Sequence, residues 1–217
     1  MEDGFVITID GPAGSGKSTI AKVVASKINF TYLDTGAMYR CVAYLSDKKD
    51  FRPAEIAKNL NFEIKNNDNS IRIYANGEDV TSEIRTNKVD NKVAKISKIK
   101  EVRKYLIKKQ RDFAKKKNVI LEGRDTGTVV FPNADIKFYL DASVDIRAER
   151  RYNQMNEEKD IKISKIKKDI IKRDNIDKSK KWGALKRAED AYYIDTTNLS
   201  KKEVVGEIIS YIKKYED

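Results

Sequence analysis

The chain has 217 residues, of which 40% are hydrophobic and 36% are charged, and its formal net charge is +11. This length suits one domain, or one domain with a modest insertion. The chain contains no histidine and a single cysteine, Cys41. These counts exclude Ser–His and Cys–His nucleophilic catalysis and argue against a structural zinc site. Phosphoryl transfer remains open, because positioning and cationic groups supply most of its catalysis.

The sequence lacks the features of membrane and secreted proteins. No apolar run approaches the ~18 residues that a membrane helix needs. Residues 1–4 are acidic and lead directly into an apolar run, unlike a signal peptide. One cysteine cannot form an internal disulfide, which favours a reducing compartment. We therefore expect a cytoplasmic protein with no membrane partner.

The strong positive charge has two interpretations. A basic protein can bind nucleic acid. An enzyme that handles several phosphate groups also needs excess positive charge. The sequence shows no basic stripe interleaved with aromatic residues, so we expect no nucleic-acid partner.

In chain order, short strands and helices alternate over the first 60 residues. Apolar runs predict buried strands over 5–10 and 31–33, and apolar spacing predicts helices over 17–28 and 37–46. Pro53 is typical of the first turn of a further helix.

The segment 61–81 has a different pattern. Apolar and polar residues alternate over 62–64 and 71–74, and turn-forming residues separate these runs at 67–70 and 76–77. This alternation predicts a small antiparallel sheet inserted into the β/α chain.

Two Lys-rich helices are predicted next, over 82–96 and 100–116, before short apolar strands return over 119–121 and 136–140. Residues 143–175 are predicted to be helical and are very basic.

The last predicted elements are a strand over 192–195 and a helix over 201–215, which Ser200 and Glu203 open as a capping box.

Strands that alternate with helices imply a parallel sheet with helices on both faces. The predicted fold class is therefore α/β, with a parallel-sheet core, an inserted small antiparallel sheet with helices, and a helical lid. Ligands bind beyond the carboxyl ends of the strands in such folds. Asp34, the segment 122–125 and Asp141 fall at such ends.

A phosphate-binding motif lies between the first predicted strand and the first predicted helix. Residues 11–18 fit G-x-x-x-x-G-K-[ST]. The glycines let successive backbone N–H groups point at phosphate oxygens, and the helix N-terminus adds positive potential. We expect Lys17 to reach the β- and γ-phosphates of ATP and Ser18 to ligate Mg²⁺. The predicted ATP-binding residues are Gly11, Pro12, Ala13, Gly14, Ser15, Gly16, Lys17, Ser18 and Thr19.

Other features favour a kinase that acts on a small phosphorylated acceptor. Residues 87–90 (Asn-Lys-Val-Asp) spell the N-K-x-D motif with which GTPases read guanine. They precede a predicted helix instead of following a strand of the main sheet, so we interpret the match as coincidental. Arginine binds phosphate through two hydrogen bonds and keeps its charge, and Arg40, Arg124 and Arg173 stand in motif-like positions.

Three further arginines, Arg147, Arg150 and Arg151, cluster on the predicted helix after the 136–140 strand. A closing lid would bring their charge to the transferring phosphoryl group. They could equally form a solvated helix face with partners such as Glu149, and the sequence leaves both interpretations open.

Four stretches of the chain resemble bacterial cytidylate kinases, in the order found in that family. They are residues 7–19 (ITIDGPAGSGKST), 33–40 (LDTGAMYR), 122–132 (EGRDTGTVVFP) and 188–191 (AEDA). The phosphate-loop spelling is shared among P-loop kinases, whereas the other three stretches together are specific. The resemblance implies phosphoryl transfer from ATP to CMP or dCMP, giving ADP and CDP or dCDP, with Mg²⁺ as cofactor.

The same resemblance implies a domain organisation. A P-loop core would comprise residues 1–61 and 116–217, with a lid at about 145–182, and a CMP-binding insertion would comprise residues 62–115. We expect the enzyme to act as a monomer.

The resemblance also assigns roles to individual residues. Arg40 would bind the CMP phosphate, with Arg124 as a second phosphate ligand. Asp125 would read the cytosine edge with Ser97 and Arg103, and a carboxylate suits the cytosine amino group. Arg173 and Asp177 would contact the ribose. The implied CMP-binding set is Thr35, Arg40, Ser97, Arg103, Arg124, Asp125, Arg173, Asp177 and Lys180, and the implied catalytic set is Lys17, Arg124, Arg147, Arg150 and Arg151.

One stretch departs from the family pattern. Where the family commonly has R-D-x-R-D-x-x-R, residues 173–180 carry Ile176 at the fourth position and Lys180 at the last. A lysine contacts phosphate as a point charge without the arginine fork, which predicts weaker binding of the acceptor phosphate. Two alternatives remain open: a related P-loop kinase acting on UMP, dTMP or shikimate, and a basic NTPase that binds nucleic acid.

Overall fold

The computed structural model describes residues 4–48, 51–67, 70–154 and 162–216. The chain divides into two compact units. The first unit comprises Met1–Tyr32 and Ala114–Asp217, and the second comprises Leu33–Phe113. The second unit therefore contains residues 62–113 of the predicted insertion together with the residues that precede it.

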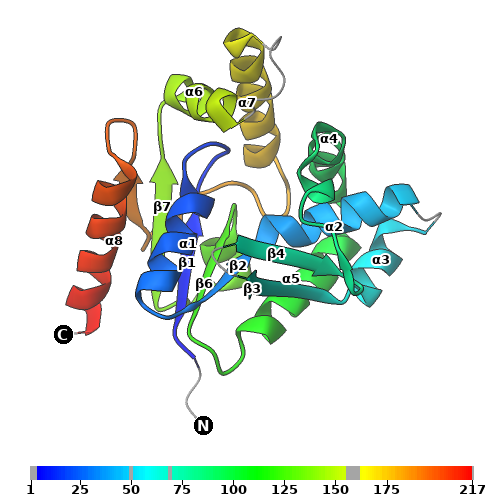
Figure 1. The fold of residues 1–217 in the computed structure, drawn as a ribbon, viewed down its shortest axis with the longest axis horizontal. Coiled ribbons are helices and arrows are strands. Elements are labelled where there is room, and N and C mark those ends of the chain that lie inside the picture. The colour runs from blue at the N-terminus through cyan, green and yellow to red at the C-terminus, as the bar shows by residue number, and fades with distance from the viewer. Residues whose placement is uncertain (1–3, 49–50, 68–69, 155–161, 217) are drawn as a thin grey trace. The chain divides into compact units, whose positions relative to one another are not determined.

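The main sheet has five strands in the order β2-β6-β1-β7-β8 (Figure 1). Its strands are β1 (Val6–Asp10), β2 (Thr31–Asp34), β6 (Val119–Gly123), β7 (Ile136–Asp141) and β8 (Tyr192–Asp195). Strand β1 pairs in parallel with β6 and β7, and β8 pairs in parallel with β7. The strands are short and apolar because their side chains are buried; Ile9, Leu121 and Leu140 have no exposed surface.

Among the described residues, the first unit contains the α-helices α1 (Lys17–Lys27), α6 (Val144–Gln154), α7 (Ile163–Lys178) and α8 (Lys201–Glu216). Helix α1 contacts β1, β6 and α8. The predicted capping box is confirmed at the start of α8, because the Ser200 N–H donates to Glu203 Oε2 at 2.7 Å and the Glu203 N–H donates to Ser200 Oγ at 3.3 Å. The fold class predicted from the sequence is confirmed.

The stretch 143–175, which was predicted to be helical, contains two helices in the described residues, α6 and α7. Helices α6 and α7 contact each other, and Ala148 of α6 forms one buried apolar cluster with Ile166 and Ile170 of α7. A single straight helix would leave these side chains exposed on one face, so burial of the cluster favours two packed helices. Residues 155–161 lie outside the described residues.

The second unit combines helices with a small sheet. Its helices are α2 (Thr35–Lys48), α3 (Pro53–Asn59), α4 (Asn87–Ile96) and α5 (Lys100–Ala114), the last ending at the boundary. The predicted antiparallel sheet is confirmed and has the order β3-β4-β5, formed by Phe62–Asn67, Ser70–Ala75 and Glu78–Asp79. Asn76 and Gly77, in the tight turn before β5, have φ values of 54° and 86°, as a two-residue hairpin turn requires.

The predicted helix over 82–96 is interrupted at Thr86. A 3₁₀ turn over Glu83–Arg85 comes first, and Thr86 then takes an extended conformation and accepts a hydrogen bond from the Val89 N–H. This side-chain cap starts α4 and gives it an N-terminus of its own.

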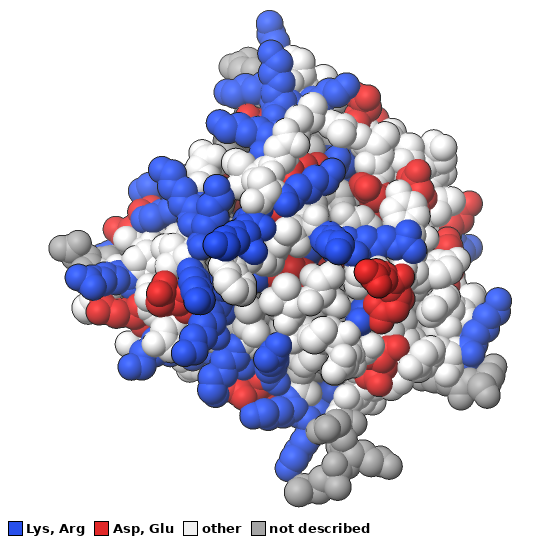
Figure 2. Space-filling view, turned by 180° about the vertical axis from the view of Figure 1, so that it is seen from behind, with Lys and Arg blue, Asp and Glu red and all other residues white. Residues whose placement is uncertain are grey.

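No helix within the described ranges is long and apolar enough to cross a membrane. Lys and Arg side chains are spread over the face shown in Figure 2, with Asp and Glu side chains between them.

Candidate active site

The predicted phosphate loop joins β1 to α1 through three glycines in backbone conformations that other residues rarely adopt. The φ values are 153° for Gly11, 78° for Gly14 and 91° for Gly16. A Cβ on Gly11 would lie 2.0 Å from the carbonyl oxygen of Leu140, so the loop and β7 come closer than a side chain allows. The strand–loop–helix context that the motif needs is therefore present.

Lys17 and Ser18 lie at the first turn of α1 and make different contacts. The Lys17 ammonium donates to the carbonyl oxygen of Pro12 at 3.0 Å, across the loop, and the side chain is buried. Ser18 Oγ donates to Glu122 Oε1 at 2.6 Å, and the Tyr32 hydroxyl donates to the same oxygen at 3.3 Å. A hydroxyl beside a buried carboxylate offers the hard oxygen ligands that a divalent cation prefers.

Glu122 was absent from the residues predicted to form the site. Its signal in the sequence was its position near the carboxyl end of a buried strand, where ligands bind in parallel sheets. Among the residues that the structure describes, no group of three His, Cys, Asp or Glu side chains could hold a metal. A divalent cation at Ser18 and Glu122 would thus need further ligands from a nucleotide or water.

Asp10, the last residue of β1, organises the segment that follows Arg124 and Asp125. Its carboxylate accepts hydrogen bonds from the Thr126 N–H at 2.9 Å, the Thr126 hydroxyl at 2.7 Å and the Gly127 N–H at 2.7 Å. These bonds hold the start of a π-helical turn over Thr126–Val130. Burial raises the pKa of Asp10 despite the bonds, which favour the charged form. Asp125 itself is buried.

Arg124, Asp177 and Lys180, all predicted to bind CMP, come together in the first unit. Arg124 Nε donates to Asp177 Oδ2 at 3.1 Å, and the Lys180 ammonium lies 2.7 Å from Asp177 Oδ1. Burial alone would raise the pKa of Asp177, but the charges of Arg124, Lys180 and Arg173 together hold this pKa below its ordinary value. One buried carboxylate therefore holds two of the predicted phosphate ligands.

Arg147, one of the three lid arginines, is buried and does not belong to a solvated helix face. Its Nε donates to the Ala142 carbonyl at 2.9 Å, and its Nη1 donates to the Ala13 carbonyl at 3.0 Å and to Asp174 Oδ2 at 2.6 Å. Arg147 thus connects α6, α7 and the phosphate loop.

Arg150 contacts the phosphate loop through Thr196, which follows β8. Its guanidinium donates to the Thr196 hydroxyl at 2.9 Å and to the Thr196 carbonyl at 2.6 Å, and this hydroxyl lies 3.2 Å from the Ser15 carbonyl oxygen. Arg151 is half-buried on α6.

The start of α2 in the second unit carries Thr35, which is buried. Asp34 caps this helix, because its Oδ1 accepts from the Ala37 N–H at 2.9 Å. One turn later, Arg40 Nη1 donates to the Ile84 carbonyl at 3.2 Å and forms an ion pair with Asp90 Oδ1. Asp90 ends the Asn-Lys-Val-Asp stretch, which lies at the start of α4 and follows a 3₁₀ turn. That position is consistent with the interpretation that the stretch does not read guanine.

Ser97 and Arg103, the predicted cytosine readers of the second unit, are both buried. Ser97 ends α4 and its Oγ lies 3.4 Å from the Ala94 carbonyl oxygen. The guanidinium of Arg103 lies 5.9 Å from the ring centroid of Tyr39, a cation–π distance. Tyr39 directly precedes Arg40 in α2. One part of this helix therefore carries Arg40 and also contacts Arg103.

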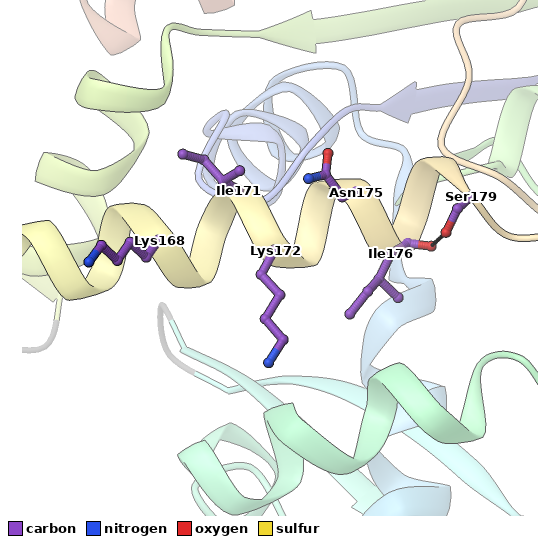
Figure 3. A pocket seen from close by; sticks show the side chains of 6 residues that line it. All are labelled: Lys168, Ile171, Lys172, Asn175, Ile176 and Ser179. Atoms are coloured by element: carbon purple, nitrogen blue, oxygen red, sulfur yellow. Dashed lines mark hydrogen bonds between the residues drawn. The ribbon is translucent and has the colours of Figure 1, made fainter.

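A shallow pocket follows one side of α7 (Figure 3) and is lined by Lys168, Ile171, Lys172, Asn175, Ile176 and Ser179. Ile176 is one of the two residues that depart from the family pattern, the other being Lys180. At the C-terminal end of α7, the Ser179 hydroxyl donates a hydrogen bond to the Ile176 carbonyl at 3.2 Å. The pocket contains none of the residues predicted to bind a nucleotide.

The family model and the relatives with similar sequences carry the same description. The family model described as cytidylate kinase matches residues 7–214. The chain is 45% identical to a cytidylate kinase of Fusobacterium nucleatum, over 98% of this chain and 99% of that protein. It is 42% identical to a cytidylate kinase of Bacillus cereus strain G9842, over 98% and 97% of the two chains.

Solved structures support the fold. A gluconokinase of Sinorhizobium meliloti has a TM-score of 0.52 at 13% identity and covers 97% of this chain and 92% of its own. The protein TT1252 of Thermus thermophilus has a TM-score of 0.53 at 12% identity, with 98% of both chains covered. Because the cytidylate kinase model matches almost the whole chain and the relatives are covered over nearly their full length, the chain belongs to the cytidylate kinase family.

Proposed function

We propose that the chain transfers the γ-phosphoryl group of ATP to CMP or dCMP and releases ADP and CDP or dCDP. The observation that carries this proposal is its 45% identity, over almost the full length of both chains, to a protein named cytidylate kinase. The phosphate loop and the cationic side chains described above supply the chemistry that such a transfer needs.

The ATP phosphates bind the loop from Gly11 to Thr19. Backbone N–H groups of the loop and the N-terminus of α1 attract the phosphate oxygens. Lys17 leaves the Pro12 carbonyl and neutralises charge that develops on the γ-phosphoryl group. Arg147, Arg150 and Arg151 add positive charge from α6.

Mg²⁺ is the proposed cofactor, and Ser18 and Glu122 are the residues that would hold it. When bound, the ion neutralises charge on the β- and γ-phosphates. Ser18 would contribute a hydroxyl ligand, and Glu122 would orient that hydroxyl through the 2.6 Å hydrogen bond.

The acceptor is held by side chains. Arg40 and Arg124 bind the CMP phosphate, with Lys180 as a further cation. The attacking phosphate oxygen is already anionic, so the transfer needs no strong general base. Asp125, Ser97 and Arg103 read the cytosine edge, and Thr35, Arg173 and Asp177 complete the CMP-binding set, with the last two contacting the ribose.

The enzyme acts on these small molecules as a cytoplasmic monomer, without nucleic acid or membrane. Light scattering of the purified protein tests the oligomeric state against the chain mass of 24.9 kDa. A mass twice that value would contradict the monomer.

An acceptor panel tests the proposed function. ADP release is measured with CMP, dCMP, UMP, AMP, dTMP and shikimate at equal concentrations, and the phosphorylated product is identified by chromatography. We expect CMP or dCMP to give the highest kcat/KM. A higher value for another acceptor, or ATP hydrolysis that needs added DNA or RNA but no acceptor, would contradict the proposal.

A further inference from the structure

One nitrogen of the Arg40 guanidinium, Nη1, donates hydrogen bonds to two acceptors. Within the described residues, both of its hydrogen bonds leave from Nη1, one to the Ile84 carbonyl at 3.2 Å and one to Asp90 Oδ1. The Arg40 and Asp90 side chains are only 17% and 12% exposed, so water screens this pair weakly.

The geometry of the guanidinium gives this anchoring a consequence. The group is planar, and the N–H groups of Nε and Nη2 point the same way, as two parallel donors. Bonds at Nη1 leave that edge intact and fix the plane in which it lies. An oxyanion that meets this edge receives two hydrogen bonds from an arginine that is already oriented.

An acidic residue beside a phosphate-binding arginine has two opposing effects. Its charge weakens the attraction between the arginine and a phosphate. Its hydrogen bond orders a long side chain before the ligand arrives, which removes an entropic cost from binding. The second effect is favoured here because Asp90 takes Nη1, together with a backbone carbonyl, and not the Nε–Nη2 edge.

We propose that Asp90 is a positioning residue for the acceptor, holding Arg40 so that its Nε–Nη2 edge faces the phosphate of the nucleoside monophosphate. The inference rests on the proposed function, which gives Arg40 its phosphate but assigns nothing to Asp90. It also gives a role to the last residue of the Asn-Lys-Val-Asp stretch, whose spelling otherwise stays unexplained.

Steady-state kinetics of Asp90→Ala and Asp90→Asn test the proposal. Asp90→Ala removes the anchor, and we expect KM for CMP to rise about tenfold while kcat changes less than about twofold. KM for ATP should stay at the wild-type value. Asp90→Asn keeps an oxygen acceptor and should raise KM for CMP by a smaller factor, and this variant also serves if Asp90→Ala does not fold.

Asp47→Asn is the matched control. Asp47 lies on α2 and pairs with Lys88 at 3.2 Å and with Lys92, both on α4. Its replacement removes ion pairs between the same two helices as the Arg40–Asp90 pair, without touching Arg40. We expect KM for CMP to remain at the wild-type value.

A double variant separates positioning from general stabilisation of α4. If Asp90 acts through Arg40, adding Asp90→Ala to Arg40→Met should leave KM for CMP as it is in Arg40→Met alone. Additive effects, equal increases in KM for CMP and ATP, or an unchanged KM for CMP in Asp90→Ala would each overturn the inference. A lower KM would do the same, since it would mean that Asp90 competes with the phosphate. A wild-type enzyme that does not phosphorylate CMP would instead refute the proposed function.

Discussion

The two sets of groups assigned to phosphate are built in different ways. The proposed ATP side is one continuous loop, in which backbone N–H groups would be the donors and three left-handed glycines shape the path. The proposed acceptor side uses side chains, and carboxylates hold them: Asp90 holds Arg40, and Asp177 holds both Arg124 and Lys180. A backbone site therefore depends on the absence of side chains, whereas a side-chain site depends on acidic partners that fix its cations.

The difference separates the expected effects of mutation. Changes in the loop should affect ATP and catalysis, and adding a Cβ there should cost stability. Changes among the carboxylate-held cations should act mainly on the acceptor and should depend on pH.

The largest effect is expected for Lys17→Met on the ATP side. The variant loses the cation that neutralises charge on the transferring group, so kcat should fall by about 10²–10³-fold. Rapid-quench or coupled assays at saturating CMP and ATP measure this loss. Lys27→Met, at the exposed end of the same helix, is the control and should retain its rate. A near-normal kcat in Lys17→Met would refute the scheme.

Gly11→Ala tests the geometric demand of the loop. The added Cβ would lie 2.0 Å from the Leu140 carbonyl oxygen, at a φ of 153°. We expect the free energy of unfolding to fall by about 3 kcal/mol, through both overlap and backbone strain. Urea denaturation measures the change.

Gly206→Ala is the matched control for that variant. Gly206 lies within α8, and apart from its chain neighbours and the nearby backbone of that helix no heavy atom lies within 4 Å of the position of its added Cβ. This substitution should stabilise the protein by up to about 1 kcal/mol through helix propensity. Equal stabilities for the two glycine variants would contradict the close approach of the loop to β7.

Asp177→Asn tests the carboxylate on the acceptor side. The folded pKa of Asp177 lies below its ordinary value, so its charge stabilises the protein above the unfolded pKa of about 3.9. This stabilisation is lost as the pH falls through the lower, folded pKa. At pH 7 we expect the variant to be less stable by about 2 kcal/mol, and the gap should close in acid. Denaturation curves from pH 7 down to about pH 2 measure it, and a gap that does not change with pH would contradict the ion-pair account.

The smallest expected effect is a gain in affinity in Lys180→Arg. The arginine would restore a bidentate donor where the chain departs from its family, and KM for CMP should fall about threefold. Lys178→Arg, an exposed position two residues earlier, controls for the added guanidinium. An unchanged or higher KM for CMP in Lys180→Arg would show that Lys180 does not weaken binding of the acceptor phosphate.

The sequence predicted what is local. The phosphate loop is contiguous, so its glycines and Lys17 were evident from spacing alone, and the alternation over 62–64 and 71–74 identified the small sheet. Among the strands of the described residues, β5 alone was missed, since two residues carry no periodicity.

The distant partners of the site side chains were not predictable in this way. Asp90 lies 50 residues from Arg40, Asp177 lies 53 from Arg124, and Glu122 lies 104 from Ser18. Spacing rules describe neighbours on one helix or strand, and they contain no information on pairs that only the folded chain brings together. For the same reason the sequence did not show that the helical stretch over 143–175 divides into α6 and α7: the packing of Ala148 against Ile166 and Ile170 is a tertiary contact.

Transfer of label from γ-labelled ATP to CMP, by the wild-type enzyme and by Arg40→Met, tests the central claim most directly. The account predicts labelled CDP from both proteins, with the rate of the variant recovering when CMP is raised and KM for ATP unchanged. Label that appears only in inorganic phosphate, or a deficit in Arg40→Met that follows ATP instead of CMP, would contradict it.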